Sequence, residues 1–517
     1  MGHHIGEGSR PGVVKFHAPE IVFGEGSLVE AAHATARLGG VRPMLVTDPG
    51  LTAAGWVDEL RRHLLDRGLS PTVWSDLTPN PKDYEVTAGH EVYREAGCDV
   101  LVALGGGSVI DAAKGIAILA ANGGSILDYE GVDRASLPIP PMVMVPSTSG
   151  TGADVSQFCV VTDTARGSKI TIIGRSLVPD LTVIDPRLLT TMPDDLNAAT
   201  GLDALTHGVE AFVSLAHNPL TDHHALRAID MVTGTLVRTI DDPLHMEARA
   251  AMAQASLEAG LAFTNAILGA THAMSHQVGG LLDQPHGVIN GVLLPHVIRF
   301  NGAADPDPYV TIAATLGLDE ARGPAADAVE AVAARIDDLS RRVGVPRGLK
   351  QLGVTESDLP RLAEGHSATL HVHQSAHRNP RADDRTVPDG AVSAPDLSAL
   401  TGLRSGKRRS ILNIAVRQNV SNGSCTRSNW YPEPGPHRRG PRDTDLRRCG
   451  GCSRTSECPL GGVRAHRRHP AGCGAAPTRA RARRHPVPGR QRRRAAAAGR
   501  GGLRPRRYPP RIDRAGR

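Results

Sequence analysis

Short β-rich runs alternate with helical stretches over residues 15–186, and this alternation constrains the fold more than any other feature of the chain. Helical patterns lie between several of the strand-like runs, for example over residues 53–67 and 111–121. Strands that alternate with helices predict a parallel sheet covered on both faces. The predicted strands cover residues 44–48, 99–104, 142–146 and 181–185.

The β pattern stops at about residue 194, and Ala/Leu-rich helical windows continue to about Gly365. The change falls between Pro186 and Pro193. We therefore predict an α/β nucleotide-binding domain over residues 1–190 and an all-helical domain over residues 191–365.

The composition changes again at His366, where hydrophobic periodicity ends. Residues 366–517 hold about 32 Arg, one Lys and about 9 acidic residues, or roughly +24, whereas the first 365 residues are near −18. A segment of Arg, Pro, Gly and Ala buries too little apolar area to offset its chain entropy. We predict that residues 366–517 form a disordered tail.

Two functional interpretations of this tail are open. Arginine runs neutralise phosphates, so one is nucleic-acid binding. The other is a zinc module, but the spacing to the third cysteine is shorter than in a zinc ribbon, and no apolar sequence surrounds it. The cysteines concerned are Cys449, Cys452, Cys458 and Cys473.

We favour a third explanation, in which the tail is an out-of-frame translation. The near-complete replacement of Lys by Arg is what a GC-rich gene gives in the wrong frame. Residues 370–378 can be back-translated so that the next frame encodes Cys-Met-Ser-Thr-Asn-Pro-Arg-Thr. Resequencing the gene tests this hypothesis, and normal codon bias after residue 366 contradicts it.

The rest of the composition predicts a cytoplasmic protein. There is no run of 18 or more apolar residues, so no membrane span is predicted. The first residues lack a basic-then-apolar signal pattern. Cys98 and Cys159 are the only cysteines before residue 366, which is typical of a reducing compartment without disulfides.

The predicted helical domain carries five candidate metal ligands. Asp203 and His207 are four residues apart, which places both on one face of a helix, and His272 and His276 repeat this spacing. His286 follows in a loop-like Pro-His-Gly sequence. A single Asp/His pair is more often a surface or capping pair, but imidazoles in apolar sequence need partners. Three imidazoles and a carboxylate favour Fe²⁺ or Zn²⁺ over Mg²⁺ or Ca²⁺.

Glycines at a strand-to-helix turn indicate a nucleotide site. Residues 105–108 read Gly-Gly-Gly-Ser and follow a predicted strand, so backbone amides there can approach a diphosphate. A second polar loop, residues 146–152, also follows a strand, and the two loops should meet at the carboxyl edge of the sheet. Asp48 can accept hydrogen bonds from a ribose hydroxyl, which favours NAD over NADP, although an ordinary turn explains it equally well.

Together these residues resemble the iron-containing (group III) alcohol dehydrogenase family. The resemblance runs from about Phe16 to about Gly365 and rests on residues 16–26, 105–114, 147–154, 179–186, 201–207 and the histidines at 272, 276 and 286. It implies a dehydroquinate synthase-like architecture, in which an N-terminal α/β nucleotide-binding domain and an all-helical C-terminal domain enclose the active site. Asp154 departs from the pattern, since the family usually has Glu there.

The resemblance also implies site roles. The metal ligands would be Asp203, His207, His272 and His286, which leaves His276 for proton relay or substrate contact. The residues implied to bind the coenzyme are Asp48 at the adenosine ribose, Asn80 near the adenine, Gly106, Gly107 and Ser108 at the diphosphate, and Thr148, Thr151 and Lys169 along the nucleotide and nicotinamide.

The implied function is a metal-dependent NAD(H) alcohol dehydrogenase that interconverts an alcohol and its aldehyde or ketone, with Fe²⁺ or alternatively Zn²⁺. Its partners would be a small alcohol or aldehyde and further copies of the chain, with no nucleic acid and no membrane. The alternative in the same superfamily is a metal-independent reductase similar to maleylacetate reductases, which generally lack the full ligand set. A nucleic-acid-binding role for the tail ranks below both.

Overall fold

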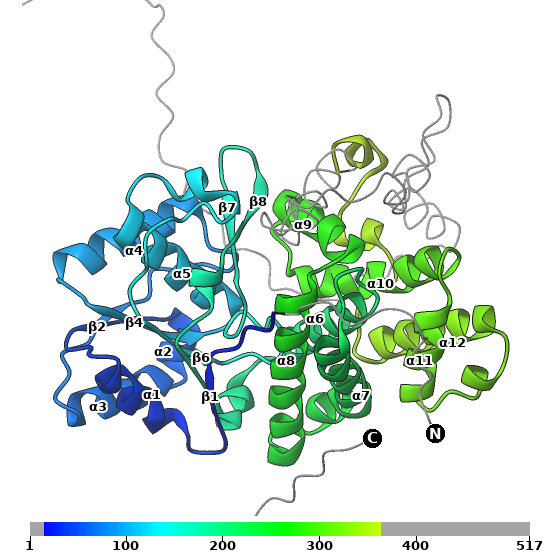
Figure 1. Ribbon diagram of the computed structural model, residues 1–517, viewed down its shortest axis with the longest axis horizontal. Helices are drawn as coiled ribbons and strands as arrows, with labels where there is room; N and C mark the ends of the chain where they lie inside the picture. The colour runs from blue at the N-terminus through cyan, green and yellow to red at the C-terminus, as the bar shows by residue number, and fades with distance from the viewer. Residues whose placement is uncertain (1–14, 363–517) are drawn as a thin grey trace, which may run out of the picture. The chain divides into compact units, whose positions relative to one another are not determined.

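The computed structural model describes residues 15–362, which belong to one compact unit. A parallel six-stranded sheet lies at the centre of the N-terminal part, in the order β1-β9-β6-β4-β2-β3 (Figure 1). All four predicted strands are confirmed, as β2, β4, β6 and β9. The strands of this sheet are β1 (Glu20–Phe23), β2 (Pro43–Val46), β3 (Thr72–Trp74), β4 (Val100–Gly105), β6 (Met142–Pro146) and β9 (Leu181–Ile184).

Helices cover both faces of this sheet, as predicted, because alternate strand residues point to opposite sides. On one face α1 (Leu28–Arg37), α2 (Pro49–Ala53) and α3 (Trp56–Asp66) pack on a set that includes Leu45 and Val102. On the other face α4 (Asp83–Glu95) and α5 (Gly107–Asn122) pack on a set that includes Met44 and Leu101.

Two predicted helix boundaries were wrong. The helix predicted over residues 53–67 is α3, which begins three residues later at Trp56, because Gly55 with a φ of +85° separates it from α2. The helix predicted to begin at Asp111 begins at Gly107, so the glycine turn is already its first turn. Glycine disfavours helix interiors, which is why the sequence pattern placed these residues in a loop.

A second sheet, in the order β5-β8-β7, was not predicted. Its strands are β5 (Gly131–Val132), β7 (Phe158–Asp163) and β8 (Ser168–Ile173), of which β7 and β8 form an antiparallel hairpin. Figure 1 shows this hairpin beside α9 (Ala270–Leu282), and β8 packs on that helix. The hairpin therefore joins the strand-containing part of the chain to the helical part.

From Asp194 onward the described residues contain helices and no strand, as the sequence predicts. These helices share one hydrophobic core, which includes Leu205, Ile229 and Leu293. Helix α6 lies at its centre, and most of its residues are buried. The remaining helices are α6 (Asp194–Phe212), α7 (Pro219–Asp241), α8 (Met246–Ala266), α10 (His286–Gly302), α11 (Asp307–Thr315) and α12 (Ala325–Arg342). Short 3-10 segments are η1 (Ile126–Tyr129), η2 (Arg175–Leu177), η3 (Pro186–Thr191), η4 (Asp319–Arg322), η5 (Leu349–Leu352) and η6 (Glu356–Asp358).

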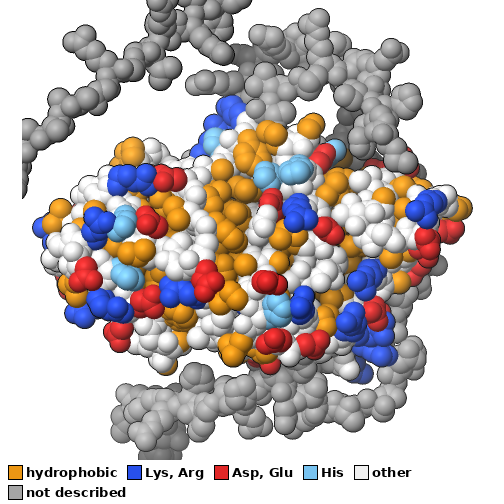
Figure 2. Space-filling model, turned by 90° about the horizontal axis from the view of Figure 1, so that it is seen from below, with side chains coloured by type: hydrophobic (Ala, Val, Ile, Leu, Met, Phe, Trp, Pro, Cys, Tyr) orange, Lys and Arg blue, Asp and Glu red, His pale blue; other side chains and the backbone are white. Residues whose placement is uncertain are grey.

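On the surface seen in Figure 2, acidic and basic side chains are interspersed, and hydrophobic side chains gather in a band near the middle of this face.

Among the described residues, no helix is long and apolar enough to cross a membrane. The boundaries at residues 190 and 365 stay predictions. The predicted disordered tail, residues 366–517, lies outside the described residues.

Candidate functional site

One cleft of about 770 Å³ receives side chains from the carboxyl ends of the strands and from the helical part. Every site residue predicted from the sequence lines it. At one end lie Asp203, His207, His272, His276 and His286, and along the rest lie Asp48, Asn80, Gly106, Gly107, Ser108, Thr148, Thr151 and Lys169. The fold thus brings together two sets of residues that are far apart in the sequence, although it leaves their roles untested.

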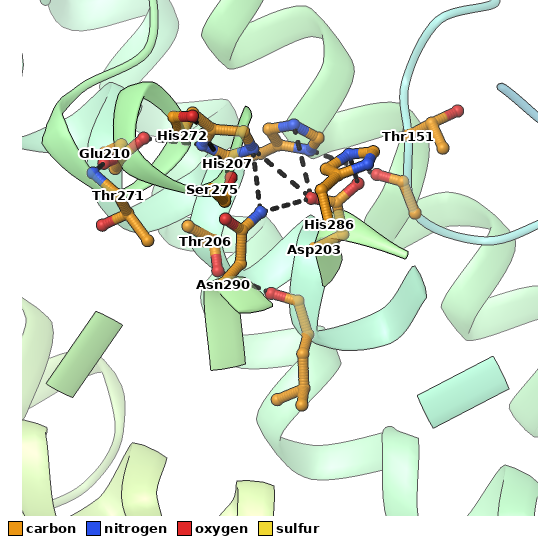
Figure 3. A network of polar contacts seen from close by, with 12 residues as sticks. Thr151, Asp203, Thr206, His207, Glu210, Thr271, His272, Ser275, His286 and Asn290 are labelled. Atoms are coloured by element: carbon orange, nitrogen blue, oxygen red, sulfur yellow. Dashed lines mark hydrogen bonds and ion pairs between the residues drawn. The ribbon is translucent and has the colours of Figure 1, made fainter. Parts of the chain in front are cut away.

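Three of the four predicted metal ligands form a compact buried group (Figure 3). Asp203 and His207 project from one face of α6, and His272 approaches them from α9. One ligand atom from each of the three lies within 4.8 Å of the others. The Asp203 carboxylate is 3.8 Å from His207 Nε2 and 3.3 Å from His272 Nε2.

His286, the fourth predicted ligand, is the first residue of α10. Its Nε2 lies 3.2 Å from Asp203 Oδ2, but it does not belong to the compact three-residue group. Its side chain is 28% exposed. The next residue must be small, because a Cβ at Gly287 would lie 2.1 Å from the carbonyl oxygen of Ala199 in α6. This close approach brings the start of α10 to Asp203.

Buried groups outside the predicted set orient the imidazoles. His272 Nδ1 donates to Glu210 at 2.7 Å, and the same carboxylate accepts the backbone N–H groups of Gly269 and Thr271 at 2.9 and 2.6 Å. His207 Nδ1 donates to the carbonyl oxygen of Gly150 at 3.2 Å. Because each Nδ1 is engaged in this way, the Nε2 atoms face Asp203, which is the arrangement that metal-binding histidines need.

The charges of this cluster favour a cation. Although burial raises the pKa of Asp203, the imidazoles of His207, His286 and His272 hold it well below its usual range. Burial lowers the pKa of His207 to about 4, so this ring is neutral. Although burial also lowers the pKa of His272, the carboxylates of Asp203 and Glu210 raise it to about 9. A divalent ion between these groups would replace the proton at His272 Nε2, so the donor set fits a metal.

His276 lies one turn beyond His272 on α9 and is buried. Its ring centroid is 6.1 Å from that of His272 and 6.0 Å from that of His286. Apolar side chains complete this end of the cleft: the Phe263 ring stacks on His207 at 4.3 Å, and Phe158 packs on Phe263 at 5.6 Å. Apolar rings therefore cover the His207 side of the candidate metal site, and the His276 imidazole lies beside that site.

The first turn of α5 forms the floor of the nucleotide end of the cleft. Gly106 caps the helix and Gly107 opens it, so backbone N–H groups and the positive end of the helix dipole face the cleft. A Cβ on Gly107 would lie 2.7 Å from Thr151 Cγ2, and one on Gly106 would lie 3.0 Å from Thr148 Cγ2. The glycines thus let the loop that carries Thr148 and Thr151 lie close to the N-terminus of α5, where a diphosphate could meet the backbone N–H groups.

Asp48 and Asn80 already have partners within the protein. Asp48 caps α2, where one carboxylate oxygen accepts the Leu51 N–H at 3.0 Å. The Asn80 side chain donates to Asp283 at 2.7 Å and accepts from Lys169 Nζ at 2.7 Å. Burial lowers the pKa of Lys169 to about 8, although Asp283 and other carboxylates oppose this shift.

Sequence reasoning missed four residues near the site. Glu210 lies seven residues after Asp203, and Asn290 lies four after His286, so helical spacing could have identified both. Asn290 Nδ2 donates to Asp203 Oδ1 at 2.8 Å. Lys114 Nζ is buried and donates to the carbonyl oxygens of three residues that follow β6, at 2.6 to 2.8 Å. The fourth residue is Asp283, which accepts from Asn80. No local sequence signal marks the contacts of Lys114 or of Asp283.

Asp154, where the resembling family usually has Glu, is buried. Its carboxylate accepts from Thr182 Oγ1 at 3.1 Å. Burial raises the pKa of Asp154, against the hydrogen bond from Thr182 and the charge of Lys114. The shorter acid is thus satisfied inside the α/β part.

Two family models match this chain. "Iron-containing alcohol dehydrogenase" matches residues 18–186, and "Fe-containing alcohol dehydrogenase family, C-terminal" matches residues 197–386. The second match continues past Gly365, where the sequence resemblance was expected to end.

Several known proteins are similar over most of their length. The chain is 42% identical over 344 residues to the 1,3-propanediol dehydrogenase of Citrobacter freundii, covering 66% of this chain and 89% of that protein. It is 36% identical over 349 residues to the NAD-dependent methanol dehydrogenase of Bacillus methanolicus, covering 68% and 92%. A solved structure of a 1,3-propanediol oxidoreductase aligns with a TM-score of 0.67 and 38% identity, covering 70% of this chain and all (100%) of that one.

Proposed function

The chain belongs to the iron-containing alcohol dehydrogenase family, and from this premise we propose that it is an NAD(H)-dependent dehydrogenase of short primary alcohols that uses Fe²⁺. One observation carries the proposal: the histidine and aspartate cluster and the glycines at the start of α5 line a single cleft. A metal at one end and a dinucleotide along the rest would bring an alcohol and a hydride acceptor together.

Asp203, His207, His272 and His286 would hold the metal. Fe²⁺ bound there would supply a Lewis acid that lowers the pKa of a substrate alcohol. Glu210 would keep His272 in the tautomer that leaves Nε2 available, through its 2.7 Å hydrogen bond to Nδ1. Zn²⁺ suits the same ligands, so it is the alternative metal.

The nucleotide end would hold NAD(H), which supplies the hydride acceptor or donor. The N–H groups around Gly106 and Gly107 would bind the diphosphate. Asp48 retains one carboxylate oxygen for the adenosine ribose, beyond the one that caps α2. Lys169, Thr148 and Thr151 line the path from the diphosphate to the cluster.

His276 would move the hydroxyl proton, because it is the imidazole beside the cluster that the ligand set leaves over. Phe158, Phe263 and Leu268 are buried around this end and would exclude water from the reacting alcohol. These apolar walls, together with the names of the relatives, support short alcohols between methanol and 1,3-propanediol in size as substrates. The homo-oligomer and the cytoplasmic location remain predictions.

The test is an anaerobic assay of the full-length chain with methanol, ethanol and 1,3-propanediol plus NAD⁺, and with the matching aldehydes plus NADH. We expect turnover that a chelator abolishes and Fe²⁺ restores. His286→Ala should lose roughly 100-fold or more in kcat/KM, whereas His296→Ala, on the same helix but outside the cleft, should keep its activity.

Absence of metal binding and of alcohol oxidation would contradict the proposal. Reduction of maleylacetate without metal would instead support the metal-independent alternative.

A further inference from the structure

Asp283 contacts the loop that precedes α4, which carries Asn80 and Lys82, from the opposite side of the cleft. Its Oδ1 accepts from Asn80 Nδ2 at 2.7 Å, and its Oδ2 lies 3.5 Å from Lys82 Nζ. Asp283 ends α9, whereas Asn80 and Lys82 lie between β3 and α4, 203 residues away from Asp283 in the case of Asn80. These contacts therefore connect the helical part to the α/β part across the site.

Both partners adopt a backbone conformation that residues other than glycine rarely use. Asn80 has a φ of +58° and Asp283 a φ of +52°, and only four described non-glycine residues have a positive φ. Asn and Asp tolerate this conformation better than other side chains, but it still carries a cost. Conformations of this kind persist where the surrounding structure holds them, often at functional sites.

Along the chain, Asp283 lies close to the candidate metal site. Asp283 is followed by Gln284 and Pro285, and His286 then opens α10. A connection this short makes the position of Asp283 affect that of His286. This matters because His286 is the predicted ligand outside the compact group of Asp203, His207 and His272.

Through its hydrogen bond to Asn80, Asp283 is also connected to the predicted coenzyme path. The Asn80 amide holds Asp283 with its nitrogen and accepts from Lys169 Nζ with its oxygen at 2.7 Å. Asn80, Lys169 and Asp283 all line the cleft, and the Asp283 side chain is 63% exposed. A dinucleotide that contacts Asn80 or Lys169 would therefore act on the same hydrogen-bonded chain.

We propose that Asp283 is a positioning residue that couples coenzyme binding at Asn80 to metal binding at His286. This inference rests on the proposed function. Ordering of the Asn80 amide by the coenzyme would fix Asp283, and Asp283 would fix the turn that presents His286 to Asp203. Binding of either ligand then strengthens binding of the other by the same factor.

The expected coupling is that of one hydrogen bond at a partly exposed site. Such a bond corresponds to about two- to tenfold in an equilibrium constant. The neighbouring Lys82 contact adds little, because its atoms are 3.5 Å apart and the Asp283 side chain is 63% exposed, and solvated ion pairs are weak. Asp283→Asn keeps an oxygen that can accept from Asn80, whereas Asp283→Ala removes it.

The experiment titrates the full-length chain with Zn²⁺ against a fluorescent chelator, with and without saturating NADH, and titrates NADH with and without Zn²⁺. In the unaltered chain we expect each ligand to tighten the other about two- to tenfold. Asp283→Ala and Asn80→Ala should bring this factor close to one. Asp283→Asn should retain it, as should Asp230→Ala, which removes an exposed aspartate ion pair on α7.

Independent binding of Zn²⁺ and NADH in the unaltered chain would overturn the coupling while leaving the proposed function standing. Retention of the full coupling factor by Asp283→Ala would do the same. Failure of the unaltered chain to bind either ligand would overturn the proposed function as well.

Discussion

Glu210 and His272 form a buried carboxylate–imidazole pair, with Glu210 Oε2 2.7 Å from His272 Nδ1. The same carboxylate accepts two backbone N–H groups at the start of α9. Although burial raises the pKa of Glu210, these hydrogen bonds and the His272 charge lower it to about 2. One side chain on α6 therefore sets both the orientation of a predicted ligand and the entry of the helix that carries it.

We expect Glu210→Gln to weaken metal binding by about 10- to 100-fold, the usual effect of losing an outer partner of a metal-binding histidine. Glutamine has one acceptor oxygen where Glu210 uses two. Chelator competition with Fe²⁺ or Zn²⁺ measures the change. Glu330→Gln, which alters an exposed ion pair with Arg299, is the control, and equal metal affinities in the two variants would contradict the prediction.

Gly107→Ala should weaken NADH binding roughly tenfold, because its Cβ would lie 2.7 Å from Thr151 Cγ2 and would force the Thr151 loop away from the start of α5. Fluorescence titration of NADH measures this. Gly234→Ala on α7 is the matched control: beyond the neighbouring backbone of its own helix, no atom lies within 4 Å of its Cβ, so it should stabilise the fold by about 0.5–1 kcal/mol and leave NADH affinity unchanged. Normal NADH affinity in Gly107→Ala would show that the start of α5 does not contact the coenzyme.

NADH binding should weaken as the pH rises through about 8. Burial lowers the pKa of Lys169 to about 8, so its ammonium is present below that pH and is lost above it. A negatively charged coenzyme binds the protonated form better, and binding falls by about fivefold, the difference between a charged and a neutral hydrogen bond. Titrations from pH 6.5 to about 9.5 measure the profile.

Lys169→Arg should flatten this profile, because guanidinium keeps its charge throughout the range. An unchanged pH dependence in Lys169→Arg would assign the titration to another group.

At Ile267, replacement by glycine should destabilise the fold less than replacement by alanine, the reverse of the usual order. It follows α8 with a φ of +70° and a ψ of 175°, a region that is essentially restricted to glycine, while its side chain is buried beside Leu268. Ile267→Ala loses the burial and keeps the strain, whereas Ile267→Gly loses the burial and relieves the strain. Thermal or denaturant unfolding should therefore find Ile267→Gly more stable than Ile267→Ala by about 1 kcal/mol or more, and the reverse order would refute this.

Local sequence patterns predicted which side chains of the candidate site share a helix face, because helix geometry is local. The four-residue spacings of Asp203 with His207 and of His272 with His276 place each pair on one helix face whatever the rest of the chain does. The same holds for the glycines between β4 and α5 and for the alternation that produced a parallel sheet. Boundaries failed at Gly55 and Gly107, where glycine allows both helix and turn.

The tertiary structure alone decided how these local pieces meet. It joins Asp283 to Asn80 across 203 residues, sets His286 apart from the compact group, and places Gly150 against His207. Such contacts depend on how closely α6, α9 and α10 pack, as at Gly287 against Ala199, and close packing involves many residues at once. The sequence thus determined which side chains share a helix face, and long-range packing determined which of them face one another across the cleft.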